Sequence, residues 1–379
     1  MSLRDARPLW GEIDLPAVTH NVALIRRMAG RPVNILAPVK ANAYGHGVVE
    51  IGRHLAGLGV EGLATANVEE AIALRRAGVA CPILLYGAQL PAGNAVLLEH
   101  RLTPTIHGRE GLEAVDALGR ARGAPVPVHV KVDAGLGRLG VRLDEAADFV
   151  ASVLDRPGLI LEGIYTHIPF SDAAGADWSA RRLRAFADLV AAVETRHGMR
   201  IAYAQAGASA VLAGALPDRL NTVAPGHLTF GLSPLAGRRA ETLGFRKALR
   251  ALRARLIHVG RRRAGDDLLG TGPGGLGADA TTGVILFGMD NGYRPAAPGR
   301  VAHVLCGGRR CPVLAVSAEY SVIDLSGVDA PRLGDLVTII GDDGDAAIAV
   351  EDVAADQGAP SAAYWQIALR SVPLVVDRG

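Results

Sequence analysis

A lysine in a glycine-rich turn is the residue of this chain best placed to do chemistry. Lys40 follows the apolar run 33–37, which predicts a short buried strand, and precedes the helical pattern 48–58. A lysine at such a strand end can be partly desolvated, which lowers its pKa and frees the amine to form a Schiff base with an aldehyde. Tyr44 and the turn glycines would offer an anion a hydroxyl and close backbone approach. From spacing alone, a surface lysine in an ordinary loop is the simpler interpretation.

Three further segments place polar or basic residues at the ends of predicted strands. Arg138 lies in a turn rich in glycine, and its planar guanidinium suits a carboxylate or a phenolate oxygen. His167 follows an apolar strand, where a structural histidine is the more common occupant. The segment 207–209 is expected to open a helix, so the hydroxyl of Ser209 would suit a phosphate group.

Alternating strands and helices must position these residues. Eight strands are predicted, at 34–39, 62–66, 82–86, 102–106, 126–133, 159–167, 201–205 and 220–224. Helical patterns lie between them, and this count is that of a (β/α)8 TIM-type barrel, whose chemistry gathers at the C-terminal ends of the strands. A doubly wound open sheet is the alternative, but no Gly-x-Gly-x-x-Gly opens a helix after the first strand.

After about residue 233 the pattern changes to short apolar runs separated by Gly, Pro and Asp, which predicts a mainly β domain. We therefore expect a barrel domain over 1–238 and a β domain over 239–379. Packing of the first ten or so residues on the β domain is an alternative to their place in the barrel domain. The glycine-rich segment 270–277 lacks the Lys-Ser/Thr that closes a phosphate loop, so we interpret it as an exposed loop.

Composition excludes several classes of protein. A net charge of +2 over 379 residues argues against a nucleic-acid binder. No charge-free apolar run is long enough to cross a bilayer, and residues 1–9 carry charges without an apolar signal core. The three cysteines show no ligand-like spacing and no paired framework, so we expect no metal site and a reducing cytoplasm.

The run Lys-Ala-Asn-Ala-Tyr-Gly-His-Gly at 40–47 resembles, without a break, the cofactor-lysine motif of the alanine racemase family. In that family the lysine forms the internal aldimine with pyridoxal 5'-phosphate (PLP). The resemblance implies PLP as cofactor, an amino acid as small-molecule substrate and a homodimer. It also implies catalytic roles for Lys40, Arg138 and His167.

The resemblance extends to other segments. It implies that Arg138 contacts the cofactor's O3' and the substrate carboxylate, and that His167 flanks the cofactor. The family's lysine at the position of Lys131 can be carbamylated to hold that arginine. The residues implied to hold the cofactor phosphate are Tyr44, Ser209, Gly226, His227 and Arg370.

Some positions depart from the family pattern. Ser209 lies one place later than the family's Asn-Ser pair, and Ala224 stands where the family has an arginine against the pyridine nitrogen. The region 266–271, which matches the site of the family's second catalytic base, contains no tyrosine. The usual Met-Asp of a later loop is replaced by Ala318-Glu319.

The expected function is that of a PLP-dependent amino acid racemase or epimerase that works through a Lys40 aldimine and abstraction of the α-proton. The departures leave other possibilities open. One is a PLP enzyme of another reaction type, such as a decarboxylase, an aldolase or a lyase. Another is a non-catalytic PLP-binding protein, and a third is a scaffold without activity.

Overall fold

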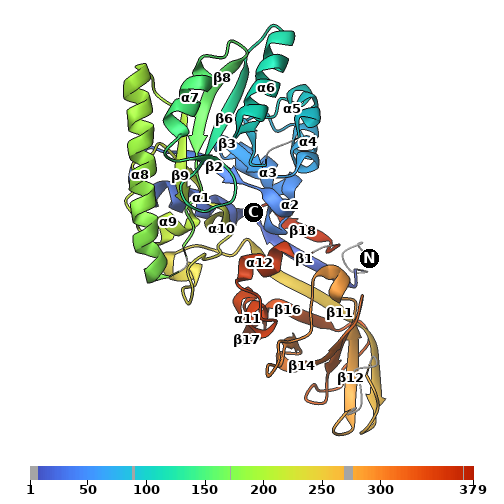
Figure 1. Ribbon diagram of the computed structural model, residues 1–379. Coiled ribbons are helices and arrows are strands. Elements are labelled where there is room, and N and C mark those ends of the chain that lie inside the picture. Colours follow the sequence, from blue (N-terminus) through green and yellow to red (C-terminus); the bar gives the residue numbers. More distant parts are fainter. Residues whose placement is uncertain (1–6, 88–89, 171, 269–275, 370) are drawn as a thin grey trace. The chain divides into compact units, whose positions relative to one another are not determined.

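The computed structural model describes residues 7–87, 90–170, 172–268, 276–369 and 371–379 (Figure 1). The chain divides into two compact units, which we call the barrel unit and the β unit. The barrel unit comprises Ala17–Ala43 and Gly47–Arg246. The β unit comprises Met1–Pro16, Tyr44–His46 and Lys247–Gly379.

Parallel strands form the centre of the barrel unit. They are β2 (Asn34–Pro38), β3 (Gly62–Thr65), β4 (Ile83–Leu85), β5 (Thr105–Ile106), β6 (Val126–Asp133), β8 (Leu159–Tyr165), β9 (Tyr203–Ala208) and β10 (Thr222–Ala224). Their order around the sheet is β4-β3-β2-β10-β9-β8-β6-β5, with the short β7 (Val141–Arg142) added beside β6. A parallel bridge between Leu84 and Thr103 brings the two ends together, so the barrel is nearly closed. The predicted fold class is confirmed.

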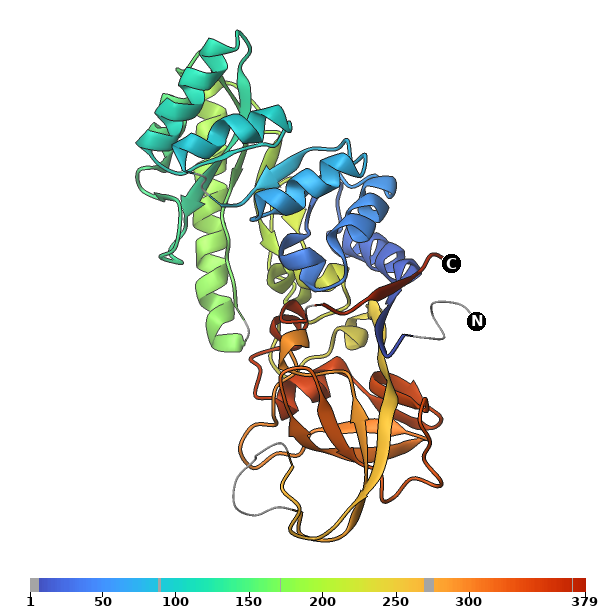
Figure 2. The same cartoon turned by 90° about the vertical axis from the view of Figure 1, so that its right-hand side faces the viewer.

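Helices cover the outside of these strands (Figure 2). The longer ones are α1 (Leu15–Met28), α3 (Val48–Gly57), α4 (Val68–Arg76), α5 (Asn94–Glu99), α6 (Arg109–Ala121), α7 (Ala146–Leu154) and α8 (Ala173–His197). The short α9 (Ser209–Ala213) and α10 (Gly226–Thr229) follow the last two barrel strands. None of the helices in the described ranges is long and apolar enough to cross a membrane.

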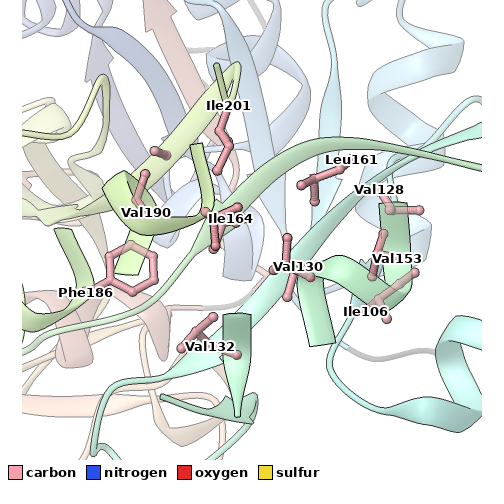
Figure 3. Packing of buried hydrophobic residues seen from close by; sticks show 14 of the residues in the cluster. Ile106, Val128, Val130, Val132, Val153, Leu161, Ile164, Phe186, Val190 and Ile201 are labelled. Carbon is pink, nitrogen blue, oxygen red and sulfur yellow. The ribbon is translucent and has the colours of Figure 1, made fainter. Parts of the chain in front are cut away.

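Strand β6 shows how the barrel separates its core from its interior. Val128, Val130 and Val132 are fully buried and pack with residues of α7 and α8, such as Val153 and Phe186 (Figure 3). Side chains alternate along a strand, so the residues between these valines point to the opposite face, into the barrel. Those inward positions carry polar groups, and the same strand therefore serves both the core and the candidate site.

The β unit contains one mixed sheet. Its strands are β1 (Leu9–Asp14), β11 (Leu249–Arg262), β12 (Ala280–Ile285), β13 (His303–Cys306), β14 (Arg309–Val316), β15 (Ser321–Asp324), β16 (Leu336–Asp343), β17 (Ala346–Ile348) and β18 (Leu374–Asp377). Strand β11, the long yellow strand in Figure 2, pairs with β1, β12 and β16. The helices α11 (Val350–Asp356) and α12 (Ala362–Ile367) complete the unit. Strand β1 also pairs in parallel with β18, so both ends of the chain contribute to this sheet.

One expected boundary was wrong. Gly207 and Ala208 do not open a helix; they are the last residues of β9. Parallel pairing with Val223 and Ala224 of β10 keeps them extended, and α9 begins only at Ser209.

The contact of α6 with the start of β8 generates a prediction about stability. A Cβ atom on Gly119 would overlap the backbone carbonyl of Gly158, whereas a Cβ on Gly111 of the same helix would meet nothing within 4 Å. We expect Gly119→Ala to lower the free energy of unfolding by about 1–3 kcal/mol through overpacking. Gly111→Ala should raise it by up to about 1 kcal/mol, because alanine favours helix.

Urea unfolding followed by circular dichroism checks both values on the full chain. Equal stability of the two variants would show that α6 shifts away from Gly158 at no cost, contrary to the packing described above.

Candidate active site

Lys40 lies immediately beyond the carboxyl end of β2. Pro38 pairs with Ala64 of β3, and the backbone N–H of Val39 donates to the Ala64 carbonyl at 2.8 Å. Hydrogen bonds to β3 therefore fix the backbone as far as Val39, the residue before the lysine. The Lys40 side chain keeps solvent-exposed surface. Desolvation by the surrounding protein and the charge of Arg138 nevertheless lower its pKa. A lowered pKa leaves more of the amine unprotonated at neutral pH, as nucleophilic chemistry requires.

The turn after Lys40 is left-handed. The four residues Ala41 to Tyr44 have φ angles between 53° and 56°, and none of them is glycine. In the rest of the described chain, residues other than glycine adopt positive φ only singly. The left-handed conformation costs an L-residue about 1–2 kcal/mol. Such a run persists only where surrounding contacts determine it.

Local hydrogen bonds close this turn. The N–H of Ala43 donates to the carbonyl of Val39 at 2.9 Å, and the N–H of Gly47 donates to the carbonyl of Asn42 at 3.0 Å. The side-chain oxygen of Asn42 accepts the N–H of Val48 at 2.8 Å, at the beginning of α3. The turn is thereby tied to the strand before it and to the helix after it.

The residues Tyr44 to His46 belong to the β unit, where they meet α12. A Cβ atom on Gly45, whose φ is 84°, would overlap the carbonyl oxygen of Gln366. Tyr44 is buried, and burial together with Tyr364 raises the pKa of its hydroxyl. The phenol of Tyr44 is therefore a neutral hydrogen-bonding group at physiological pH.

Basic side chains gather around Lys40 at the strand ends of the barrel unit. Burial lowers the pKa of His167 to about 3, and positive charge from Lys131, Lys40, Arg138 and His227 contributes in that order. Burial, with Lys40, also lowers the pKa of His227 to about 4. The structure thus brings together these five residues from four strand ends of the barrel unit. Both imidazoles are neutral at pH 7.

Lys131 of β6 is deeply buried, with 5% of its surface exposed, and its ammonium nitrogen lies 4.6 Å from the centre of the Tyr165 ring. Burial and the charge of Arg138 lower its pKa to about 7, although Asp133 acts in the opposite direction. Tyr165 was not among the site residues predicted from the sequence. Its place in β8, two residues before His167, was the available signal.

The loop that carries Arg138 is organised by Asp133. The N–H groups of Gly135, Leu136 and Gly137 all donate to this carboxylate, at 2.8 to 3.2 Å. Burial alone would raise the pKa of Asp133, but these hydrogen bonds outweigh it, so the pKa is lowered. A fixed negative charge at the base of the loop holds the tight path that the glycines predicted.

Ser209 joins two helix starts. Its hydroxyl oxygen is buried and accepts the N–H of Leu228 at 3.1 Å, which places the first turn of α9 beside the first turn of α10. Gly226 and His227 are the first residues of α10. Ala224, the last residue of β10, has a methyl side chain and cannot itself form a hydrogen bond through it.

The donor set fits PLP, which carries an aldehyde and a phosphate. Lys40 supplies an amine of lowered pKa, and the surrounding positive charge and the helix starts suit an anion. Arg370, expected to hold the phosphate, lies outside the described residues, and so do Gly270 and Thr271 of the region without a tyrosine.

Comparison with known proteins identifies the family. Residues 13–234 match the model of the alanine racemase N-terminal domain, and residues 251–373 match that of the C-terminal domain. The chain is 32% identical over 351 residues to alanine racemase of Geobacillus stearothermophilus, covering 92% of this chain and 88% of that protein.

Solved structures agree. The crystal structure of alanine racemase from Bacillus anthracis with bound L-Ala-P superimposes with a TM-score of 0.85 at 27% identity, covering 98% of this chain and 96% of that one. Alanine racemase from Clostridium difficile 630 shares the fold with a TM-score of 0.89 at 23% identity, covering 98% and 96% of the two chains. The chain therefore belongs to the alanine racemase family and is an alanine racemase-like, PLP-dependent isomerase.

Proposed function

We propose that this protein interconverts the enantiomers of an amino acid, with Lys40 as both the attachment point of PLP and a base. The observation that carries this proposal is the lowered pKa of Lys40 at the end of β2, among basic groups that suit anions. When bound, PLP withdraws electrons from the substrate α-carbon and so makes the α-proton removable. The remaining tasks fall to side chains of the chain itself.

We assign to Lys40 the removal of the substrate's α-proton. Desolvation and Arg138 lower the pKa of Lys40, which favours the unprotonated Nζ atom that can accept a proton from the α-carbon. Arg138 is assigned the substrate carboxylate, because its planar guanidinium binds two oxygens at once. His167, neutral at pH 7 with a pKa of about 3, is assigned to flank the ring without adding charge.

We assign the phosphate to Tyr44, Ser209, the backbone N–H groups of Gly226 and His227, and Arg370. The Ser209 hydroxyl beside the first turn of α10 supports this assignment. Arginine would bring a full positive charge to a position where the family has a phenol.

Lys131 is proposed to carry a carbamate. Carbamylation joins an unprotonated amine nitrogen to the carbon of CO2 and releases a proton, and a pKa of about 7 supplies that amine near neutral pH. The product would be an anion next to Arg138 in a region otherwise crowded with positive charge.

We propose that the second half of the site has diverged from the family. In the sequence, no tyrosine lies between 266 and 271, and Ala224 replaces the arginine against the pyridine nitrogen. Among the described residues, Lys40 then supplies the evident base on one face of the α-carbon, and Asp266, Asp267 and His167 are the alternatives for the other face. A different PLP-dependent reaction, a decarboxylation, an aldol-type cleavage or an elimination, is the second candidate function, and the apolar Ala224 is the observation that favours it.

We further propose a homodimer in which the β domain of one chain, residues 239–379, faces the mouth of the partner's barrel domain, residues 1–238. The exposed side chains of Met289 and Tyr320 support this proposal, because they offer apolar surface that a partner could cover. Met289 begins a short 3-10 helix, and its N–H donates to the carbonyl of Ser317, in the loop that carries Tyr320, at 2.9 Å. The cysteines are free thiols, which fits the expected cytoplasm.

The attachment of PLP has a direct test. The purified protein incubated with PLP should show the visible absorption band of lysine-bound PLP, and borohydride should bleach it. Lys40→Ala should lack the band, whereas the control Lys247→Ala, which alters an ion pair with Glu351 in the β unit, should keep it. An intact band in Lys40→Ala would exclude Lys40 as the attachment point.

The single base predicts an imbalance between exchange and racemisation. In deuterated water, a D-amino acid substrate should exchange its α-proton faster than it racemises, because Lys40 serves only one face of the α-carbon. NMR of the α-proton and chiral chromatography measure the two rates, and Lys40→Ala should abolish exchange. Equal rates from either enantiomer would require a second base.

Carbamylation of Lys131 should depend on pH. The amine is protonated and unreactive well below its pKa of about 7, so with ¹³C-bicarbonate the carbamate signal in NMR should grow as the pH rises through 7. The control Lys131→Arg keeps the positive charge but should give no signal. A signal of unchanged size in that variant would place the carbamate on another lysine.

A further inference from the structure

Glu70 has the sequence position of a simple helix cap. It lies in the first turn of α4, three residues after Asn67, whose side chain accepts the N–H of Glu70 at 2.9 Å. In a capping box the carboxylate at this position turns back to the backbone N–H of the capping residue. Its function would then be confined to α4.

The structure shows a different use of this carboxylate. The N–H of Asn67 donates to the hydroxyl oxygen of Thr65, at 3.2 Å, and so already has a partner. The Thr65 hydroxyl donates to Oε2 of Glu70 at 2.6 Å, and Oε1 accepts the backbone N–H of Asn42 at 2.6 Å. Each carboxylate oxygen is therefore used away from the helix, one at the end of β3 and one in the left-handed turn after Lys40.

The bond to Asn42 lies where that turn needs support. The other hydrogen bonds described above tie the turn to β2 and α3, its own neighbours in the chain. Glu70 instead belongs to the next strand-helix repeat, and Thr65, which orients its carboxylate, is fully buried. A hydrogen bond from a backbone N–H to a carboxylate is short and strong. It fixes the second peptide after Lys40 to a rigid part of the barrel.

We propose that Glu70 is a positioning residue for Lys40, which holds the left-handed turn through Asn42 and thereby keeps the Lys40 amine in its partly desolvated place. This inference rests on the proposed function for the role of Lys40, but its geometry stands on the barrel unit alone. Without the carboxylate, the turn would relax towards ordinary backbone angles and Lys40 would move towards water.

The test uses the PLP-free full-length protein and the rate at which acetic anhydride labels Lys40, measured by peptide mass spectrometry across a range of pH. Lys247 serves as a reference in the same molecule. In the parent protein, Lys40 should become reactive at lower pH than an ordinary lysine. In Glu70→Ala the midpoint for Lys40 should rise towards that of an ordinary lysine, while the Lys247 profile stays unchanged.

Matched variants separate positioning from capping. Glu69→Ala removes an exposed carboxylate from the same helix turn and should leave the Lys40 profile unchanged. Glu70→Gln should stay close to the parent, because its amide can accept from Asn42 and donate to Thr65. Thr65→Val removes the orienting hydroxyl at nearly constant shape. It should shift the Lys40 profile in the same direction as Glu70→Ala but by a smaller amount. If Glu70→Ala does not fold, Thr65→Val is the variant that decides the test.

A second measurement follows the cofactor. The dissociation constant of PLP should rise in Glu70→Ala on the order of tenfold, the size expected for one hydrogen bond to a charged group. If neither Glu70→Ala nor Thr65→Val moves the Lys40 labelling profile, Glu70 only caps α4 and the inference is wrong. If the parent protein binds no PLP, the proposed function fails, and the labelling profile still decides the role of Glu70.

Discussion

The crowding of positive charge at the strand ends of the barrel is the constraint on which the rest of the site depends. Burial, followed by the charge of Arg138, lowers the pKa of both Lys40 and Lys131. The two histidines relieve the crowding by staying neutral, and Asp133 relieves part of it at the base of the loop. An anion bound here is stabilised by groups that are held in place before it arrives, so little of the binding free energy is lost to rearrangement.

Much of the fold could be predicted because the barrel repeats one pattern. The eight strands appear in the predicted order, since a buried strand followed by an amphipathic helix is visible in composition and spacing. The end of β9 was missed because Gly207 and Ala208 have no strand preference of their own and are extended by pairing with β10.

In the candidate site, too, some features could be predicted from the sequence and others depend on tertiary contacts. Residues at strand ends could be brought together by topology alone, and Lys40, Arg138 and His227 do lie within electrostatic reach of His167. The left-handed turn could not be predicted, because alanine and tyrosine disfavour positive φ and only tertiary contacts impose it. Glu70 could not be distinguished from a helix cap, since the choice depends on which N–H group Thr65 has already satisfied.

The sheet of the β unit has a consequence for the order in which the chain can be assembled at the ribosome. Strand β1 is made first, yet its partners β11 and β18 come from much later in the chain, and Leu9 pairs with Ala254. The barrel strands can pair as soon as they are synthesised, whereas β1 must wait with an unpaired edge, which is prone to wrong pairing. Strand β18 is synthesised after the other strands of this sheet and pairs beside β1. The sheet therefore cannot close before β18 has been synthesised.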